Sequence, residues 1–90
     1  MSAEEAIRKG NAAKALLENE DFNTALDTVR LDAFKGWANS TPDQQQAREQ
    51  NYYLIQAIER LKLNLNALVS NAQFELKKAE RADASENGDK

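Results

Sequence analysis

The sequence predicts an all-α fold, and three observations lead to that prediction. Only three glycines and one proline occur in 90 residues, too few to separate a series of short strands and turns. Apolar residues recur at alternating steps of three and four, the spacing of one helix face. Neither glycine nor proline occurs between Asp43 and Asn87, so the second half of the chain is expected to form one long helix.

The first helix is expected to start near Ala3. Ser2 and Glu5 have capping-box spacing, in which the hydroxyl accepts from a first-turn amide and the carboxylate reaches back to the cap. Polar residues then cluster at positions 18–21, where Asn or Asp can end one helix and cap the next. We therefore predict that the first arm of the fold is kinked there.

A second helical segment follows and should end before Pro42. Its apolar residues form a seam suited to packing along another helix, namely Phe22, Leu26, Val29, Ala33 and Trp37. We interpret Trp37 as a plug that closes the end of the bundle, with an exposed anchor for a partner as the alternative.

The long helix is predicted to begin at Pro42. The run Thr41-Pro42-Asp43-Gln44 supplies a capping hydroxyl, a proline at the first helical position and a glutamine at the third. The helix should continue to about residue 80. Its seam contains Asn51, whose amide can specify register when partly buried, and the apolar residues Leu54, Ile58, Leu61, Leu65 and Leu68.

These elements predict an antiparallel helical hairpin with a kinked first arm and a long second helix. Residues 39–41 allow only a short connection, so the first arm must fold back along the long helix. We expect one domain over residues 1–80 and a flexible polar tail over residues 81–90, which lacks large apolar side chains. Because two helices share a single contact surface, we expect the hairpin to assemble into a helical bundle.

A second set of apolar residues lies away from the seam, where a two-helix hairpin has nothing to cover it. Scattered surface apolar residues, which monomers tolerate, are one interpretation. The interpretation we favour is a protein interface for self-association or for a larger partner. Its expected members are Tyr52, Leu63, Ala67 and Phe74 on the long helix, with Leu31 and Phe34 on the preceding segment.

The composition argues against an enzyme. The chain has no Cys and no His, which excludes thiol nucleophiles, imidazole bases and zinc sites that need these ligands. No glycine-rich phosphate loop is present. The acidic residues near the N-terminus spread over more than one helix face and lack the pattern of helical metal sites. We therefore expect no catalytic residue, no metal and no cofactor.

Charge limits the expected partners further. Twelve basic and fifteen acidic residues give a net charge of -3, so affinity for nucleic acid or an anionic membrane is not expected. The acidic start Met1-Ser2-Ala3-Glu4 is unlike a secretion signal, and no apolar run approaches ~18 residues. Charged pairs such as Glu59 with Lys62 are predicted to be local pairs on a solvated helix face.

Several features together resemble a family of short, mostly uncharacterised phage-encoded helical proteins. They are a leucine pair, an acidic linker with Phe, a Trp before a Thr/Pro loop, and an Arg-Glu pair that opens the final helix. In this sequence they are Leu16-Leu17, Phe22, Ala25-Leu26, Trp37, Thr41-Pro42 and Arg48-Glu49. The resemblance implies a gene among phage structural or assembly genes, a product that acts through protein contacts, and a location in the virion or the host cytoplasm.

Three functions follow as hypotheses. The first is a non-enzymatic virion or assembly protein that forms a homo-oligomer and docks on capsid, portal or tail proteins. The second is a small regulatory helical hairpin that occupies a groove on a host or phage enzyme. The third is a DNA-packaging subunit of the terminase kind whose ring would direct Arg8, Lys9, Lys14 and Arg30 toward DNA.

Overall fold

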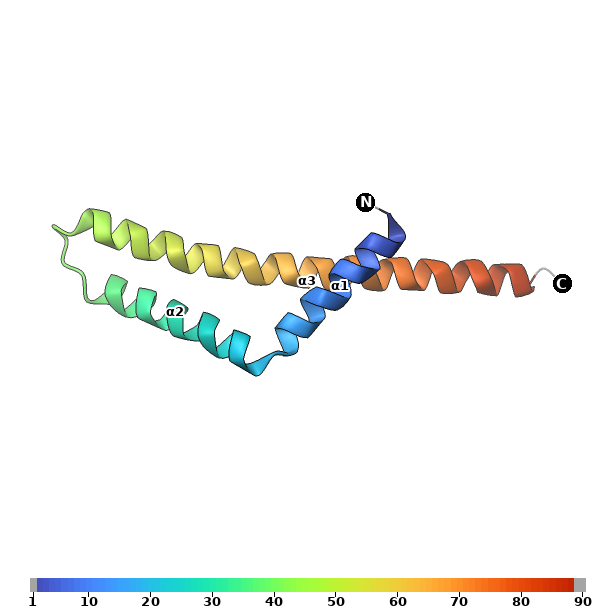
Figure 1. Ribbon diagram of the computed structural model, residues 1–90. Coiled ribbons are helices and arrows are strands. Elements are labelled where there is room, and N and C mark those ends of the chain that lie inside the picture. Colours follow the sequence, from blue (N-terminus) through green and yellow to red (C-terminus); the bar gives the residue numbers. More distant parts are fainter. Residues whose placement is uncertain (1, 89–90) are drawn as a thin grey trace. The chain divides into compact units, whose positions relative to one another are not determined.

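A computed structural model of the chain describes the backbone of residues 2–88 and the side chains of residues 2–83. Three helices are present, α1 (Ala3–Glu18), α2 (Glu20–Ala38) and α3 (Gln45–Gly88) (Figure 1), and the described residues contain no strand. The all-α prediction is confirmed. The chain forms two compact units, which we call the terminal unit (residues 1–16 and 64–90) and the hairpin unit (residues 17–63). Each is described by itself.

The predicted start of α1 and the predicted break after it are both confirmed. The hydroxyl of Ser2 accepts a hydrogen bond from the backbone N–H of Glu5 at 3.1 Å. Asn19 interrupts the helix with an extended backbone, and its side-chain oxygen accepts from the N–H of Phe22 at 2.8 Å. Asn19 is therefore the N-cap of α2, which explains why the chain leaves one helix and starts another at this residue.

Replacing Asn19 with Ala should destabilise the protein by about 1 kcal/mol, because the first turn of α2 loses the acceptor for one of its free amides. Thermal unfolding followed by circular dichroism measures the loss. Asn66→Ala is the matched control, since Asn66 is an exposed asparagine in the interior of α3. It should leave stability unchanged or raise it slightly. Equal melting temperatures for N19A and N66A would contradict the capping role.

The prediction that the last helix begins at Pro42 is wrong, because α3 begins at Gln45. The N–H of Gln44 donates to the carbonyl of Thr41 at 2.9 Å, which closes a tight turn around Pro42 and Asp43. The Gln44 side chain accepts from the N–H of Thr41, as in a capping box, at 2.9 Å. However, the Thr41 hydroxyl donates to the Asp43 carboxylate. The expected capping residues therefore build a turn before the helix.

Because of this turn, the stability of the protein should depend weakly on pH in the acidic range. Hydrogen bonds from the Thr41 hydroxyl and from the backbone N–H of Asp43 hold the pKa of that carboxyl below its usual value of 3.8. A lowered folded-state pKa means that the stabilisation is complete above the unfolded pKa and is lost as pH falls through the folded value. Melting curves of wild type and Asp43→Asn should therefore differ at pH 6 and converge as the pH falls below 3.8 and through the lowered pKa of Asp43. A constant difference across this range would contradict the role of the carboxylate.

At its other end α3 continues past the expected limit near residue 80, and its helical backbone reaches Gly88. No glycine or proline intervenes to stop it. The expected helix end is therefore wrong. The flexibility predicted for residues 81–90 stays a prediction, and residues 89 and 90 lie outside the described part of the chain.

Small residues form the core of the terminal unit, where α1 lies across α3 (Figure 1). An ideal Cβ atom built on Gly10 would stand 2.2 Å from the Cβ of Ala72 and 2.7 Å from the carbonyl oxygen of Leu68. The two helices therefore approach each other closely enough that only glycine fits at this position. The buried residues here are Ala6, Gly10, Ala13, Leu65 and Ala72, and Leu68 is half-buried.

The hairpin unit has an equally thin core. α2 and the first part of α3 run antiparallel, as predicted, and Ala33 and Ile58 are buried between them (Figure 1). Phe22, Leu26 and Asn51 are half-buried. The prediction of a buried seam is wrong for four other positions, where 38% to 43% of the side chain is exposed: Val29, Trp37, Leu54 and Leu61. Two helices share only one line of contact, so side chains flanking that line remain partly in water.

Candidate protein-interaction face

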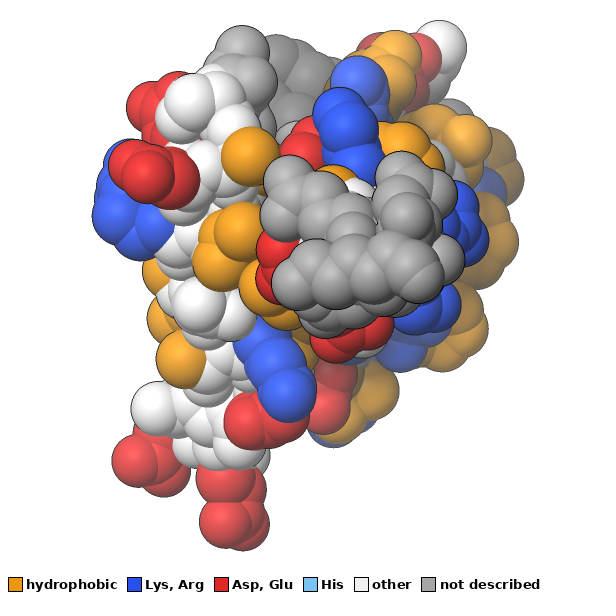
Figure 2. All heavy atoms as spheres, turned by 90° about the vertical axis from the view of Figure 1, so that its right-hand side faces the viewer, with side chains coloured by type: hydrophobic (Ala, Val, Ile, Leu, Met, Phe, Trp, Pro, Cys, Tyr) orange, Lys and Arg blue, Asp and Glu red, His pale blue; other side chains and the backbone are white. Residues whose placement is uncertain are grey.

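Every side chain predicted for the protein interface is exposed. The exposed fractions are 51% for Tyr52, 68% for Leu63, 62% for Phe74, 51% for Leu31 and 53% for Phe34, and Ala67 is exposed as well. Figure 2 shows apolar side chains at the surface among charged ones. The exposure of these residues agrees with the prediction, and their role in binding stays a prediction.

In the hairpin unit, two of these exposed residues on α2 share a hollow with an apolar residue of α3. Leu31, Phe34 and Arg30 on α2 line a shallow hollow of about 260 Å³ with the apolar side chain of Ile55 on α3. The hollow is large enough for an apolar side chain from another protein.

Trp37 continues this apolar region toward the loop. Its ring centroid lies 6.1 Å from that of Phe34, and the guanidinium carbon of Arg48 lies 5.5 Å from the Trp37 ring centroid. Arg48 also donates to the carbonyl and the hydroxyl of Ser40, both at 3.2 Å. The interpretation of Trp37 as a core plug is therefore wrong: its ring is partly exposed and is held between Phe34 and a cation.

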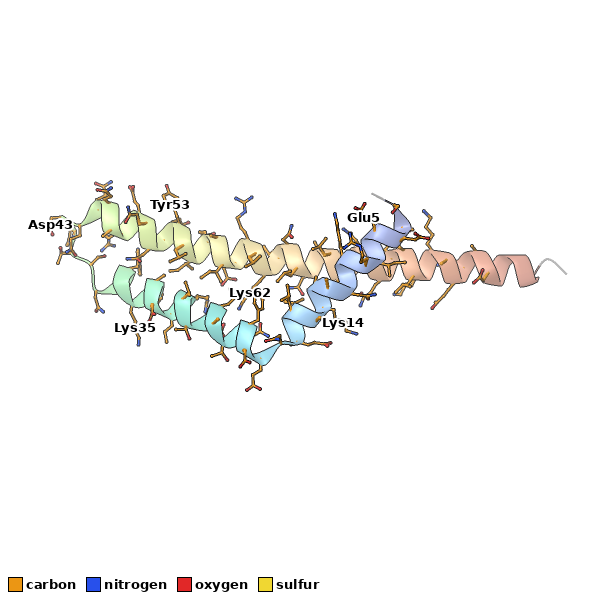
Figure 3. All side chains as sticks on the ribbon, in the orientation of Figure 1. Glu5, Lys14, Lys35, Asp43, Tyr53 and Lys62 are labelled. Atoms are coloured by element: carbon orange, nitrogen blue, oxygen red, sulfur yellow. The ribbon has the colours of Figure 1, made fainter. Side chains whose placement is uncertain are left out.

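Two ion pairs cross between the helices next to the hollow. Arg30 Nε lies 2.8 Å from Glu59 Oε1, and Lys62 Nζ lies 3.4 Å from Asp27 Oδ1. Figure 3 shows Lys62 on α3 within the same helix pair. The prediction that Glu59 and Lys62 form local pairs on one helix is wrong, because each has a partner on α2. Helical periodicity describes one helix and does not identify the residue opposite.

These residues share one side of the hairpin unit. Arg30 and Phe34 are one turn apart on α2, and Ile55 and Glu59 are one turn apart on α3. Tyr52 precedes Ile55 by one turn and Leu63 follows Glu59 by one turn. We call this surface the lateral face. It comprises the apolar residues Leu31, Phe34, Tyr52, Ile55 and Leu63 and the two ion pairs Arg30–Glu59 and Asp27–Lys62.

The Arg30–Glu59 pair should contribute little to the stability of the single chain. Its side chains are 53% and 45% exposed, and exposed pairs typically contribute about 0.2–1 kcal/mol. A double-mutant cycle with Arg30→Ala and Glu59→Ala, at a concentration where the chain is monomeric, should therefore give a coupling energy below about 1 kcal/mol. A coupling of several kcal/mol would mean that the pair is far less solvated than this geometry shows.

No three acidic side chains in residues 2–83 gather to hold a metal ion. Within the same part of the chain, no buried polar side-chain atom lacks a hydrogen-bond partner. None of the described helices is both long enough and apolar enough to cross a membrane.

Lys9 and Arg30, which belong to the basic residues considered for DNA binding, have carboxylate partners in the structure. Lys9 lies 3.9 Å from Glu5 on α1, and Arg30 pairs with Glu59. Arg8 and Lys14 are exposed on α1 (Figure 3 labels Lys14). Arg8, Lys9 and Lys14 belong to the terminal unit, and Arg30 belongs to the hairpin unit. DNA binding therefore stays a sequence-based hypothesis.

No model of a known protein family matches the chain, and no curated protein or solved structure matches it either. The function of this chain must therefore be inferred from its residues and geometry, and the phage setting rests on the resemblance alone.

Proposed function

We propose that this protein is a non-enzymatic phage virion or assembly component that acts by binding other protein. The observation that carries the proposal is the imbalance between its core and its surface. Among the described residues, the buried apolar ones are four alanines, Ile58 and Leu65. Twelve larger apolar side chains among the described residues are exposed, including Leu63 and Phe74.

This imbalance favours binding because covering exposed apolar surface releases about 25 cal/mol per Å². Isolated exposed apolar residues are ordinary on monomers, whereas contiguous patches mark interaction sites. On the lateral face, Leu31, Phe34 and Ile55 line one hollow, and the ring of Trp37 contacts Phe34. Aromatic side chains beside a hollow are typical of the residues that carry binding energy at protein interfaces.

The phage setting is tested by mass spectrometry of purified particles of the phage that encodes the chain. The expected result is that the polypeptide is present in several copies per mature particle or per assembly intermediate. Its absence from both would overturn the proposal. A tagged chain that instead recovers a host enzyme in equal amounts from infected cells would establish the regulatory function in its place.

A further inference from the structure

We infer that the lateral face binds a second copy of this chain, with the two hairpin units parallel and their loops at the same end. The inference rests on the proposed function, since it names the partner for one of the protein's contact surfaces. In this dimer the α2 helix of each copy packs against the α3 helix of the other, which makes a four-helix arrangement.

The order of charges on the lateral face supports this partner. Asp27 precedes Arg30 on α2, and Glu59 precedes Lys62 on α3. Because the helices are antiparallel, each level of the face carries one acid and one base, Asp27 with Lys62 and Arg30 with Glu59. The face is therefore neutral at each level. The acid is on α2 at the first level and on α3 at the second.

A twofold axis parallel to the hairpin helices places the acids of one copy opposite the bases of the other. It places the α3 helix of the second copy opposite α2 at the same level, so Asp27 of each copy faces Lys62 of the other. Arg30 of each copy likewise faces Glu59 of the other. Four charges of alternating sign then meet at each level, which is the complementarity that selects partners at interfaces.

The same axis also brings the two hollows together. The hollow of one copy lies opposite that of the other, so the half-exposed side chains of Leu31 and Phe34 in each copy face Ile55 of the other. Each copy thus contributes the same apolar side chains to the contact. This self-complementarity is what an isologous interface requires.

An antiparallel dimer cannot satisfy charge and apolar contact together. If its axis passes between the two ion pairs, Asp27 faces Arg30 of the other copy, but each hollow then faces the polar start of α2 around Glu20 and Asn23. If the axis passes through the hollow, the ion pairs face the end of the hairpin that holds Trp37 and Tyr52. Only the parallel arrangement matches both features.

Orientation can be tested with single cysteines, because the natural chain has none. Gln45→Cys places a thiol at the loop end of the hairpin unit, and Glu20→Cys places one at its other end; both residues are exposed. With a bismaleimide crosslinker, the parallel dimer should give 45–45 and 20–20 products. An equal mixture of the two variants should give almost no 45–20 product.

The contact itself is tested by light scattering across a concentration series. Wild type should be dimeric, and Phe34→Glu should weaken the dimer about tenfold or more, because it places a carboxylate in the apolar contact. Leu76→Glu is the control, since Leu76 is 45% exposed but belongs to the terminal unit and is not among the predicted interface residues. It should remain dimeric. Circular dichroism must show that both variants keep wild-type helicity.

The outcomes separate this inference from the proposed function. A dimer that yields only 45–20 products, or one that Phe34→Glu leaves intact, overturns the parallel lateral-face dimer and leaves the proposed function in place. A chain that is monomeric at every concentration but is found in phage particles also overturns only the dimer. A monomer that is absent from particles and assembly intermediates overturns both.

Discussion

Gly10→Ala should lower the melting temperature by about 10 °C, although alanine is the better helix former. The new methyl group would lie 2.2 Å from the Cβ of Ala72 and 2.7 Å from the backbone oxygen of Leu68. A carbonyl within a helix cannot turn aside, so α1 and α3 must separate. Overpacking of this kind costs about 3 kcal/mol, against about 1 kcal/mol gained in helix propensity. The net loss of about 2 kcal/mol gives the stated shift in a domain of this size.

Gly36→Ala is the matched control for this experiment. Its added Cβ would also be crowded, at 2.8 Å, but the neighbour is Nδ2 of Asn51, the end of a side chain that can rotate away. The propensity gain should therefore dominate, and stability should be unchanged or higher by up to about 1 kcal/mol. If Gly10→Ala melts at or above the wild-type temperature, the close packing of α1 on α3 is wrong.

Leu65→Asp should remove most of the cooperative thermal transition. Leu65 is only 7% exposed and is the largest buried side chain of the terminal unit. Losing a buried leucine costs about 2–5 kcal/mol, and placing a carboxylate among apolar neighbours adds to that cost. A domain with so small a core holds only about 3–5 kcal/mol in total. Circular dichroism should show reduced helicity at 25 °C and no sharp melting.

Leu63→Asp provides the comparison two residues away on the same helix. Leu63 is 68% exposed, so the aspartate stays hydrated, and helicity and melting temperature should remain close to wild type. Because Leu63 belongs to the lateral face, the same substitution should reduce self-association in sedimentation experiments. Normal assembly of L63D would contradict the predicted interface, and unfolding of L63D would contradict its exposure.

Much of the local structure could be predicted because it depends on neighbours in sequence. A cap residue and the amide it satisfies are three positions apart, which is why Ser2 and the polar cluster at positions 18–21 correctly marked two helix starts. The same rule misplaced the start of α3, since the Thr41 hydroxyl had a competing acceptor in Asp43. The residues at 41–44 are compatible with a helix start at Pro42 and with a turn before the helix. The hydrogen bond from the Thr41 hydroxyl to Asp43 favours the turn.

The interaction surface was predictable only in part. Periodicity correctly identified Leu31, Phe34, Tyr52, Leu63, Ala67 and Phe74 as exposed. It did not show that Leu31 and Phe34 line one hollow with Ile55, or that Arg48 lies over Trp37. Both features involve residues of different helices, and they depend on how α2 and α3 align. That alignment also determines which charges pair.

The sequence by itself determined the helical class, the break within positions 18–21, the long last helix and the apolar residues that lie away from the seam. These properties follow from backbone hydrogen bonding and from a period of ~3.6 residues, which act over a few positions. Tertiary structure alone decided the close approach at Gly10, the partial exposure of Trp37 and the pairing of Arg30 with Glu59. Each of these depends on the separation and register of two helices, which are set by side chains far apart in the sequence.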